Sequence, residues 1–182
     1  MKIKNIKSIT VYCSSSNKIS KKYKKQAKNI GIFISKKKIK LIYGGGKNGL
    51  MGEVARGVKE NKGYVIGIIP EFLKTKENMN TKIDQIIITK DMHKRKNLLY
   101  KKGDAILALP GGPGTIEEIT EIISWLNLNI HSKPIILFNY KNFWDPLIKM
   151  YNKIYDNKFN SKKSKSLFYC VNNISEFKKM FD

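Results

Sequence analysis

The chain has 182 residues, which suits one domain with a real core, and we expect residues 1–182 to form a single domain. Hydrophobic residues make up 41% and charged residues 27%, which excludes the low hydrophobicity of a disordered chain. No apolar run approaches the ~18 residues that span a membrane, and the one near the amino terminus is too short for a signal peptide. Cys13 and Cys170 lack metal-ligand spacing and fit a reducing compartment, so we expect a cytoplasmic protein without a membrane partner.

The net charge is 36 − 14 = +22, which raises the possibility of a nucleic-acid partner. Only Arg56 and Arg95 are arginines, however, and the lysines are spread along the whole chain. Proteins that read bases or bind phosphates specifically favour arginine for its bidentate fork. We therefore expect no specific nucleic-acid partner; such a protein would instead show binding that fades with salt and ignores the motifs below.

Short β-rich runs alternate with segments of helical length. The apolar residues of 115–129 recur at spacings near three and four, the pattern of an amphipathic helix. In chain order we expect a strand at 8–13, a helix at 20–35, a strand at 39–43, a helix at 49–61, a strand at 63–69, a loop at 71–81, a strand at 83–89, a helix at 91–101, a strand at 104–109, a helix at 115–129, a strand at 134–139, and helices at 143–156 and 174–181.

This alternation predicts an α/β fold: a doubly wound, Rossmann-like, mostly parallel sheet with helices on both faces. The strands are continuous apolar runs, as expected when both faces are buried. Ligands of such folds bind beyond the carboxyl ends of the strands. Three expected strand ends carry unusual residues, at 44–52, 91–96 and 110–118.

The first of these segments, GGGKNGLMG at 44–52, follows a strand and opens a helix. Gly44, Gly46 and Gly49 match the G-x-G-x-x-G pattern, in which glycines let a phosphate approach the backbone. A dinucleotide site also needs an acidic residue about 20 residues on at a strand end, and Glu71 follows Pro70, outside the strand. A tight turn that simply requires glycine is the alternative.

The segment PGGPGTIEE at 110–118 is the strongest signal. Its glycine and threonine amides at a strand-to-helix junction form a cradle for an anion. Two carboxylates, Glu117 and Glu118, follow at once, which makes sense if one of them acts on a sugar carbon beside a bound phosphate. The alternative for Glu118 is a capping box with Thr115.

In the segment DMHKRK at 91–96, Arg95 stands out in a chain that otherwise uses lysine, which indicates a need for the fork geometry of arginine. The alternative is an exposed helix start with Asp91 as its N-cap. His93 could titrate near neutrality, although a lone histidine is more often structural. No cluster of His, Cys, Asp or Glu has metal-ligand spacing, so we expect no catalytic metal.

Together these segments resemble the Lonely Guy (LOG) family of cytokinin-activating phosphoribohydrolases, often described as putative lysine decarboxylases. The resemblance covers roughly residues 8–150. The family motif PGGxGTxxE is met by Pro110, Gly111, Gly112, Gly114, Thr115 and Glu118, the Arg–Lys pair after Met-His by Met92, His93, Arg95 and Lys96, and the glycine-rich turn YGGGxxGLMG by residues 43–52.

The resemblance implies hydrolysis of the N-glycosidic bond of a nucleoside 5′-monophosphate, such as a cytokinin riboside 5′-monophosphate or adenosine monophosphate. It also implies a homodimer and no metal or redox cofactor. By this resemblance the catalytic residues are Arg95 and Glu118. Glu117 is the alternative to Glu118 as the carboxylate that acts on the ribose or on water. Its substrate-binding residues are Gly45, Gly46, Glu77, Met92, Lys96, Gly111, Gly112, Gly114, Thr115 and Glu117.

Two alternatives remain open at this point. A non-catalytic nucleotide or cofactor carrier could use the same scaffold, as relatives that bind molybdenum cofactor do. A pyridoxal-phosphate-dependent decarboxylase would need a distinctive Schiff-base lysine, and none of the many lysines stands in such a setting.

Overall fold

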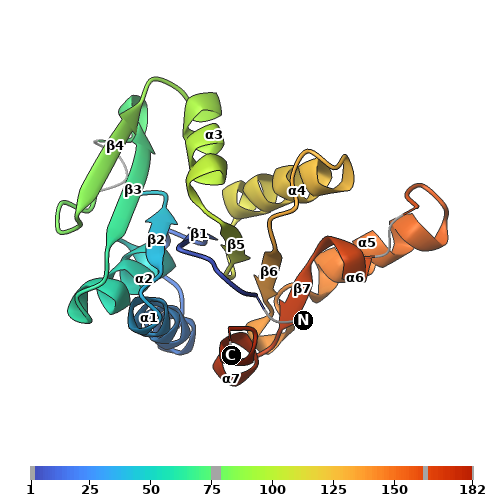
Figure 1. Ribbon diagram of the computed structural model, residues 1–182, viewed down its shortest axis with the longest axis horizontal. Coiled ribbons are helices and arrows are strands. Elements are labelled where there is room, and N and C mark those ends of the chain that lie inside the picture. The colour runs from blue at the N-terminus through green and yellow to red at the C-terminus, as the bar shows by residue number, and fades with distance from the viewer. Residues whose placement is uncertain (1–2, 75–78, 162–163, 182) are drawn as a thin grey trace.

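A seven-stranded parallel sheet forms the centre of the protein, for which a computed structural model describes residues 3–74, 79–161 and 164–181 (Figure 1). The strand order is β4-β3-β2-β1-β5-β6-β7. The strands are β1 (Ser8–Tyr12), β2 (Lys40–Tyr43), β3 (Val65–Pro70), β4 (Gln85–Thr89), β5 (Ala105–Ala108), β6 (Ile135–Phe138) and β7 (Tyr169–Val171). All six ladders are parallel, which confirms the predicted fold class.

Helices cover both faces of the sheet, α1, α2 and α7 on one side and α3 and α4 on the other (Figure 1). The helices are α1 (Lys21–Lys36), α2 (Gly49–Glu60), α3 (Met92–Lys102), α4 (Pro113–Asn127), α5 (Asp145–Asp156), α6 (Ser164–Leu167) and α7 (Ile174–Lys179). Short 3₁₀ helices lie at Glu71–Leu73 and Tyr140–Asn142.

Two hydrophobic cores result from this layering, because alternate strand residues point to opposite faces. On the α1–α2 side, Ile9 and Leu41 of the sheet join Val54 of α2 in one cluster. On the α3–α4 side, Ile106 of the sheet joins Ile119 of α4 in the other. Burial on both faces explains why the strands read as unbroken apolar runs.

The order in which strands are added to the sheet reverses between two neighbouring parallel strands, β1 and β5. From β1 the strands progress outward to β4, and the chain then returns to place β5 on the other side of β1. Such a switch point splays the loops that leave the two strands and opens a crevice between them. The loops that begin at Cys13 and Leu109 therefore flank the natural ligand site of this sheet.

The carboxyl-terminal part differs most from the expectation. The sequence predicted no strand after β6, yet β7 pairs with it in the register Leu137–Cys170, and α6 precedes β7. With only three residues, β7 is too short to give a periodic signal, so pairing with β6 is what makes it a strand. The predicted loop at 71–81 contains a 3₁₀ helix and an isolated bridge between Gly46 and Met79.

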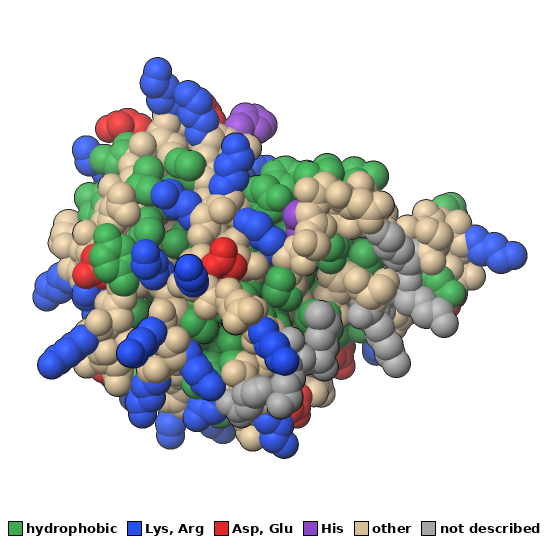
Figure 2. Space-filling model, in the orientation of Figure 1, with side chains coloured by type: hydrophobic (Ala, Val, Ile, Leu, Met, Phe, Trp, Pro, Cys, Tyr) green, Lys and Arg blue, Asp and Glu red, His purple; other side chains and the backbone are tan. Residues whose placement is uncertain are grey.

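The lysines do not gather in one compact patch on the face drawn in Figure 2, where Lys and Arg side chains lie scattered among neutral ones, mostly over the left and lower parts. Among the residues that the structure describes, no helix is long and apolar enough to cross a bilayer.

Candidate active site

Arg95 lies in the first turns of α3 and is only 6% exposed. Its Nε donates to the backbone oxygen of Ile68 in β3 at 3.2 Å, and its Nη1 donates to Oε1 of Glu118 at 2.8 Å. Asp91 is the N-cap of α3, accepting from the amide of Lys94 at 2.7 Å. The N-cap alternative is thus correct for Asp91, but the exposed role that it gave Arg95 is wrong.

Glu118 faces inward from α4 and is 6% exposed. Burial raises the pKa of its carboxyl group, and the neighbouring Arg95 guanidinium opposes that rise. Taking two charges out of water is costly, and a buried pair is weak evidence for stability, so its presence at the carboxyl end of a parallel sheet indicates a functional site.

The capping-box alternative for Glu118 is wrong. Helix α4 begins at Pro113 with Gly112 as its N-cap, so Thr115 stands in the first turn and cannot serve as the cap. Glu118 is therefore in the body of the helix, where its carboxylate binds Arg95 instead of a backbone amide.

The loop 111–114 leaves backbone donors open at the start of α4. Within the described ranges, the amides of Gly111, Gly112 and Gly114 donate to no other residue. A Cβ added at Gly112 or Gly114 would meet nothing within 4 Å, whereas one at Gly111 would lie 2.1 Å from Oγ1 of Thr115. Free donors at a positive helix end, with open space beside Gly112 and Gly114, are what an anion site requires.

The glycine-rich turn 44–52 has no such open donors at the start of α2. The Gly49 amide donates to Oδ1 of Asn17 at 3.0 Å, and the Leu50 and Met51 amides donate to the Ser14 backbone oxygen at 2.9 and 3.3 Å. Because protein acceptors already use these groups, the positive end of α2 does not offer the anion cradle that α4 offers.

A cavity of about 360 Å³ lies beside the 111–114 loop at the β1–β5 switch point. Its walls combine two serines with apolar and aromatic side chains and with two glycines. The lining residues are Ser14, Ile19, Ser20, Tyr23, Pro110, Gly111, Gly112 and Phe143.

Lys96 and Glu117, both predicted to bind substrate, contact each other across the gap between α3 and α4. Nζ of Lys96 lies 2.6 Å from Oε1 of Glu117 and 3.0 Å from Oε1 of Glu121. The Glu117 side chain is 53% exposed, in contrast to buried Glu118. Of the two adjacent glutamates, only Glu118 is therefore paired with Arg95.

The remaining residues predicted to bind substrate are Gly45, Gly46, Met92 and Glu77. Gly45 has φ +79°, and its oxygen accepts from the Asn80 amide at 2.9 Å, while Gly46 bridges to Met79. Met92 is half-buried at the start of α3. Glu77 lies outside the described residues, so its role stays a prediction.

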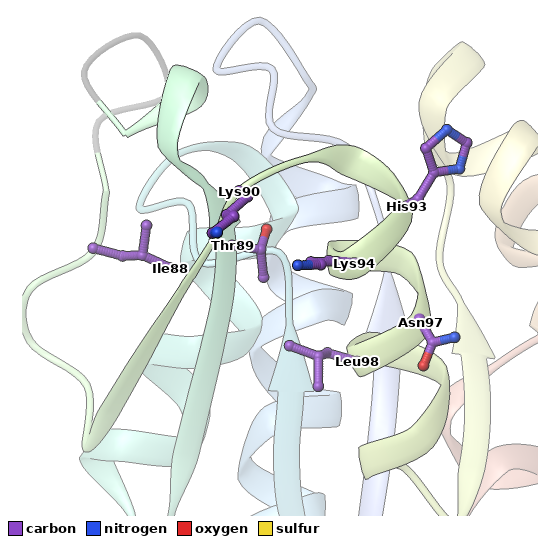
Figure 3. Close-up of a pocket in the computed structure, with 7 residues that line it drawn as sticks. All are labelled: Ile88, Thr89, Lys90, His93, Lys94, Asn97 and Leu98. Carbon is purple, nitrogen blue, oxygen red and sulfur yellow. The ribbon is translucent and has the colours of Figure 1, made fainter.

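A larger cavity, of about 530 Å³, lies between β4 and α3 (Figure 3). Figure 3 shows Lys94 and Leu98 pointing from α3 toward Ile88, with the ring of His93 turned away from the other labelled side chains. Neither Arg95 nor Glu118 is among its lining residues, so it is separate from the buried ion pair.

Sequence reasoning missed two neighbours of Glu118, Tyr12 and Cys13. Both are buried at the end of β1. Burial, followed by the negative charge of Glu118, raises the pKa of the Tyr12 phenol and of the Cys13 thiol, so both stay protonated. Their place at a strand end next to the switch point was the available signal.

Groups of three or more His, Cys, Asp or Glu residues that could hold a metal ion do not occur among the described residues. The two histidines lie apart from the ion pair: His93 is exposed, and His131 binds the Ile122 backbone oxygen and the Lys133 amide.

The chain is similar in sequence to known proteins. A family model described as "Possible lysine decarboxylase" matches residues 51–180. A probable cytokinin riboside 5′-monophosphate phosphoribohydrolase of Oryza sativa subsp. japonica is 40% identical over 145 residues, which cover 80% of this chain and 64% of that protein. A cytokinin riboside 5′-monophosphate phosphoribohydrolase of Rhodococcoides fascians is 39% identical over 143 residues, which cover 78% of this chain and 72% of that protein.

The chain belongs to the LOG family. This confirms the resemblance drawn from its motifs. The similarity continues past residue 150, since the family model reaches residue 180 and a relative from Arabidopsis thaliana is 36% identical over 178 residues, or 97% of this chain. The carboxyl-terminal strand that the motifs did not predict is thus inside the matched region.

Solved structures show the same fold outside the hydrolases. The molybdenum cofactor carrier protein of Chlamydomonas reinhardtii matches with a TM-score of 0.73 and 20% identity, covering 95% of this chain and 96% of that one. The molybdenum cofactor binding protein of Rippkaea orientalis matches with a TM-score of 0.72 and 20% identity, covering 98% and 96%. At this identity the likeness concerns the LOG fold alone.

Proposed function

We propose that the protein hydrolyses the N-glycosidic bond of a nucleoside 5′-monophosphate, releasing the free base and ribose 5-phosphate. The observation that carries the proposal is the buried Arg95–Glu118 pair, because Glu118 lies on α4, the helix whose start follows the open amides of loop 111–114. The relatives named as phosphoribohydrolases support it, although the chain spans only 64% of the first of them.

The two halves of the site fit one substrate. Glu118 lies six residues after Gly112, which a rise of ~1.5 Å per residue converts to about 9 Å along α4. Helical side chains tilt toward the amino terminus, so the carboxylate reaches back toward the loop. A phosphate on the amides and an anomeric carbon near Glu118 are therefore the two ends of a ribose 5-phosphate group.

The residues account for the chemistry of bond cleavage. As the C1′–N bond breaks, positive charge develops on the sugar, and the Glu118 carboxylate stabilises it or orients the attacking water. The water oxygen bonds to C1′, and a proton is transferred to the departing base. Arg95 holds Glu118 in place by Nη1, while its Nη2, which donates to no acceptor in the described residues, is left for the substrate.

The phosphate is proposed to lie where the 360 Å³ cavity meets the loop. Ser14 and Ser20 line that cavity together with Gly111 and Gly112, so their hydroxyl groups are candidate donors to the phosphate beside the open amides. Tyr23 and Phe143 add aromatic side chains to the same lining.

The test is a substrate panel. Purified protein is incubated with adenosine monophosphate, an N6-isopentenyl analogue and the matching nucleosides, and free base is separated by chromatography. We expect release of base from the 5′-monophosphates and not from the nucleosides. A protein that binds the nucleotides without releasing base would be a carrier, and that result would overturn the proposal.

The proposal includes two further expectations. Two copies are expected to form a homodimer, supported by exposed apolar side chains such as Leu128 and Ile130, which are 64% and 58% exposed. A cytoplasmic location is supported by Cys13 and Cys170, which are both free thiols. Sedimentation and fractionation would test them.

A further inference from the structure

The glycine-rich turn 44–52 lies beside Arg95, and we propose that Gly44 is a positioning residue for this arginine. In this proposal the turn leaves space for the guanidinium group and so keeps it in position. The phosphate is bound at loop 111–114 instead. The kinetic part of the proposal rests on the proposed function, whereas its steric part stands on the structure alone.

Space, and not backbone conformation, is what requires glycine at position 44. A Cβ added there would lie 2.5 Å from Nη2 of Arg95 and 3.1 Å from Cε of Met51. Real Cβ contacts essentially never fall below 3.0 Å. The φ angle of Gly44 is outside the left-handed region that Gly45 occupies at +79°, so alanine could adopt this backbone.

The guanidinium group cannot easily move away from an added methyl group. Arg95 is held by the Ile68 oxygen through Nε and by Glu118 through Nη1, and the whole residue is 6% exposed. Relief of the collision would lengthen one of these two hydrogen bonds. A substitution at Gly44 is thus transmitted to Glu118 without touching it.

The other role for the turn, binding a phosphate at the positive end of α2, lacks free donors in the first turn of that helix. The first amides of α2 already donate to Asn17 and to the Ser14 backbone oxygen. The seat for Arg95 is therefore the function that the geometry of the turn supports.

A double-mutant cycle separates the two roles. Gly44→Ala is made in the wild-type protein and in Arg95→Lys, whose side chain lacks Nη2. In the wild type we expect Gly44→Ala to lower kcat roughly 10-fold or more with little change in KM, because the catalytic pair is misplaced. We expect Tm to fall by on the order of 5 °C. In Arg95→Lys the same change should alter kcat less than about twofold and Tm by less than about 2 °C.

Gly63→Ala is the matched control, because its Cβ would lie 2.6 Å from Oγ of Ser35, a collision of similar size away from the site. This variant should lower Tm equally in both backgrounds and leave kcat unchanged.

The proposal would be overturned if Gly44→Ala lowered kcat and Tm equally in the wild type and in Arg95→Lys. It would also be overturned if Gly44→Ala raised KM in the wild type and left kcat unchanged. If Gly44→Ala does not fold alone, the pair Gly44→Ala/Arg95→Lys must fold, or the proposal is wrong. Should the wild type hydrolyse no nucleotide, the proposed function fails, and the Tm cycle still decides the role of Gly44.

Discussion

Arg95 and Glu118 form an ion pair of 2.8 Å in which each side chain is only 7% exposed. The partners come from α3 and α4, two helices on the same face of the sheet, and meet near the carboxyl ends of the central strands. The pair joins a cation and a carboxylate beside an open helix start. That arrangement suits a reaction in which charge develops on a phosphorylated sugar.

Removing either member of the pair should abolish most of the activity. Glu118→Gln keeps the shape of the side chain but loses the charge, and Arg95→Ala loses the group that orients it. We expect each to lower kcat/KM by roughly 10²-fold or more. Initial rates of base release from adenosine monophosphate measure the effect.

Glu117→Gln is the control for that experiment, since Glu117 is exposed and bound to Lys96. It should keep activity within about threefold of the wild type. If Glu117→Gln is the inactive variant and Glu118→Gln is not, the assignment of the working carboxylate is reversed.

Activity should depend on pH through Glu118. Burial raises its pKa above the ordinary value of 4.5, and Arg95 only partly opposes that rise. The ionised carboxylate is the active form, so kcat/KM should be lost as pH falls through the raised pKa, and the midpoint of the acidic limb should lie above 4.5. A rate profile from pH 8 downward, at constant ionic strength, measures that midpoint.

The residual activity of Glu118→Gln tests the origin of this limb, because a glutamine does not titrate. A flat profile in the variant is expected. An acidic limb that persists unchanged there would assign the ionisation to another group.

Alanine at two neighbouring positions, Gly111 and Gly112, should affect two different quantities, stability at the first and KM at the second. Gly112→Ala points its methyl group into open space, so the fold should be kept, with Tm within about 2 °C of the wild type. The methyl group would block the approach of a phosphate, and we expect KM to rise roughly 10-fold.

Gly111→Ala should instead destabilise the protein by about 2 kcal/mol, since its Cβ would collide with Oγ1 of Thr115. Thermal unfolding and KM, measured for both variants, separate the two effects. A normal KM in Gly112→Ala would place the phosphate away from this loop.

Lys96 should act mainly as a link between α3 and α4. It donates to Glu117 and Glu121, and these hydrogen bonds raise the pKa of Lys96 against the opposing effect of burial. Lys96→Met is expected to cost about 1 kcal/mol of unfolding free energy, as for a partly exposed ion pair. Urea unfolding in low and high salt measures this contribution, which salt should diminish.

If Lys96 also contacts substrate, as its motif suggested, Lys96→Met will raise KM well beyond any change in Glu121→Gln. Equal KM values in these two variants would leave Lys96 with the linking role alone.

The sequence by itself determined the fold class and predicted where the candidate site lies. Continuous apolar runs such as β5 and β6 are readable because a strand buried on both faces needs them over its whole length. The motif at 110–118 was readable because an anion cradle is local, built from consecutive amides and a helix start. The short strand β7 was not, because it depends on pairing with β6, about 33 residues away in the register Leu137–Cys170.

Tertiary structure alone decided the surroundings of individual side chains. Glu117 and Glu118 are adjacent in sequence, but a helix turns about 100° per residue, so one faces solvent and the other faces Arg95. The burial of Arg95 and the need for glycine at position 44 both arise where α3 crosses the ends of β2 and β3. Such contacts join residues far apart in the chain, and no local pattern encodes them.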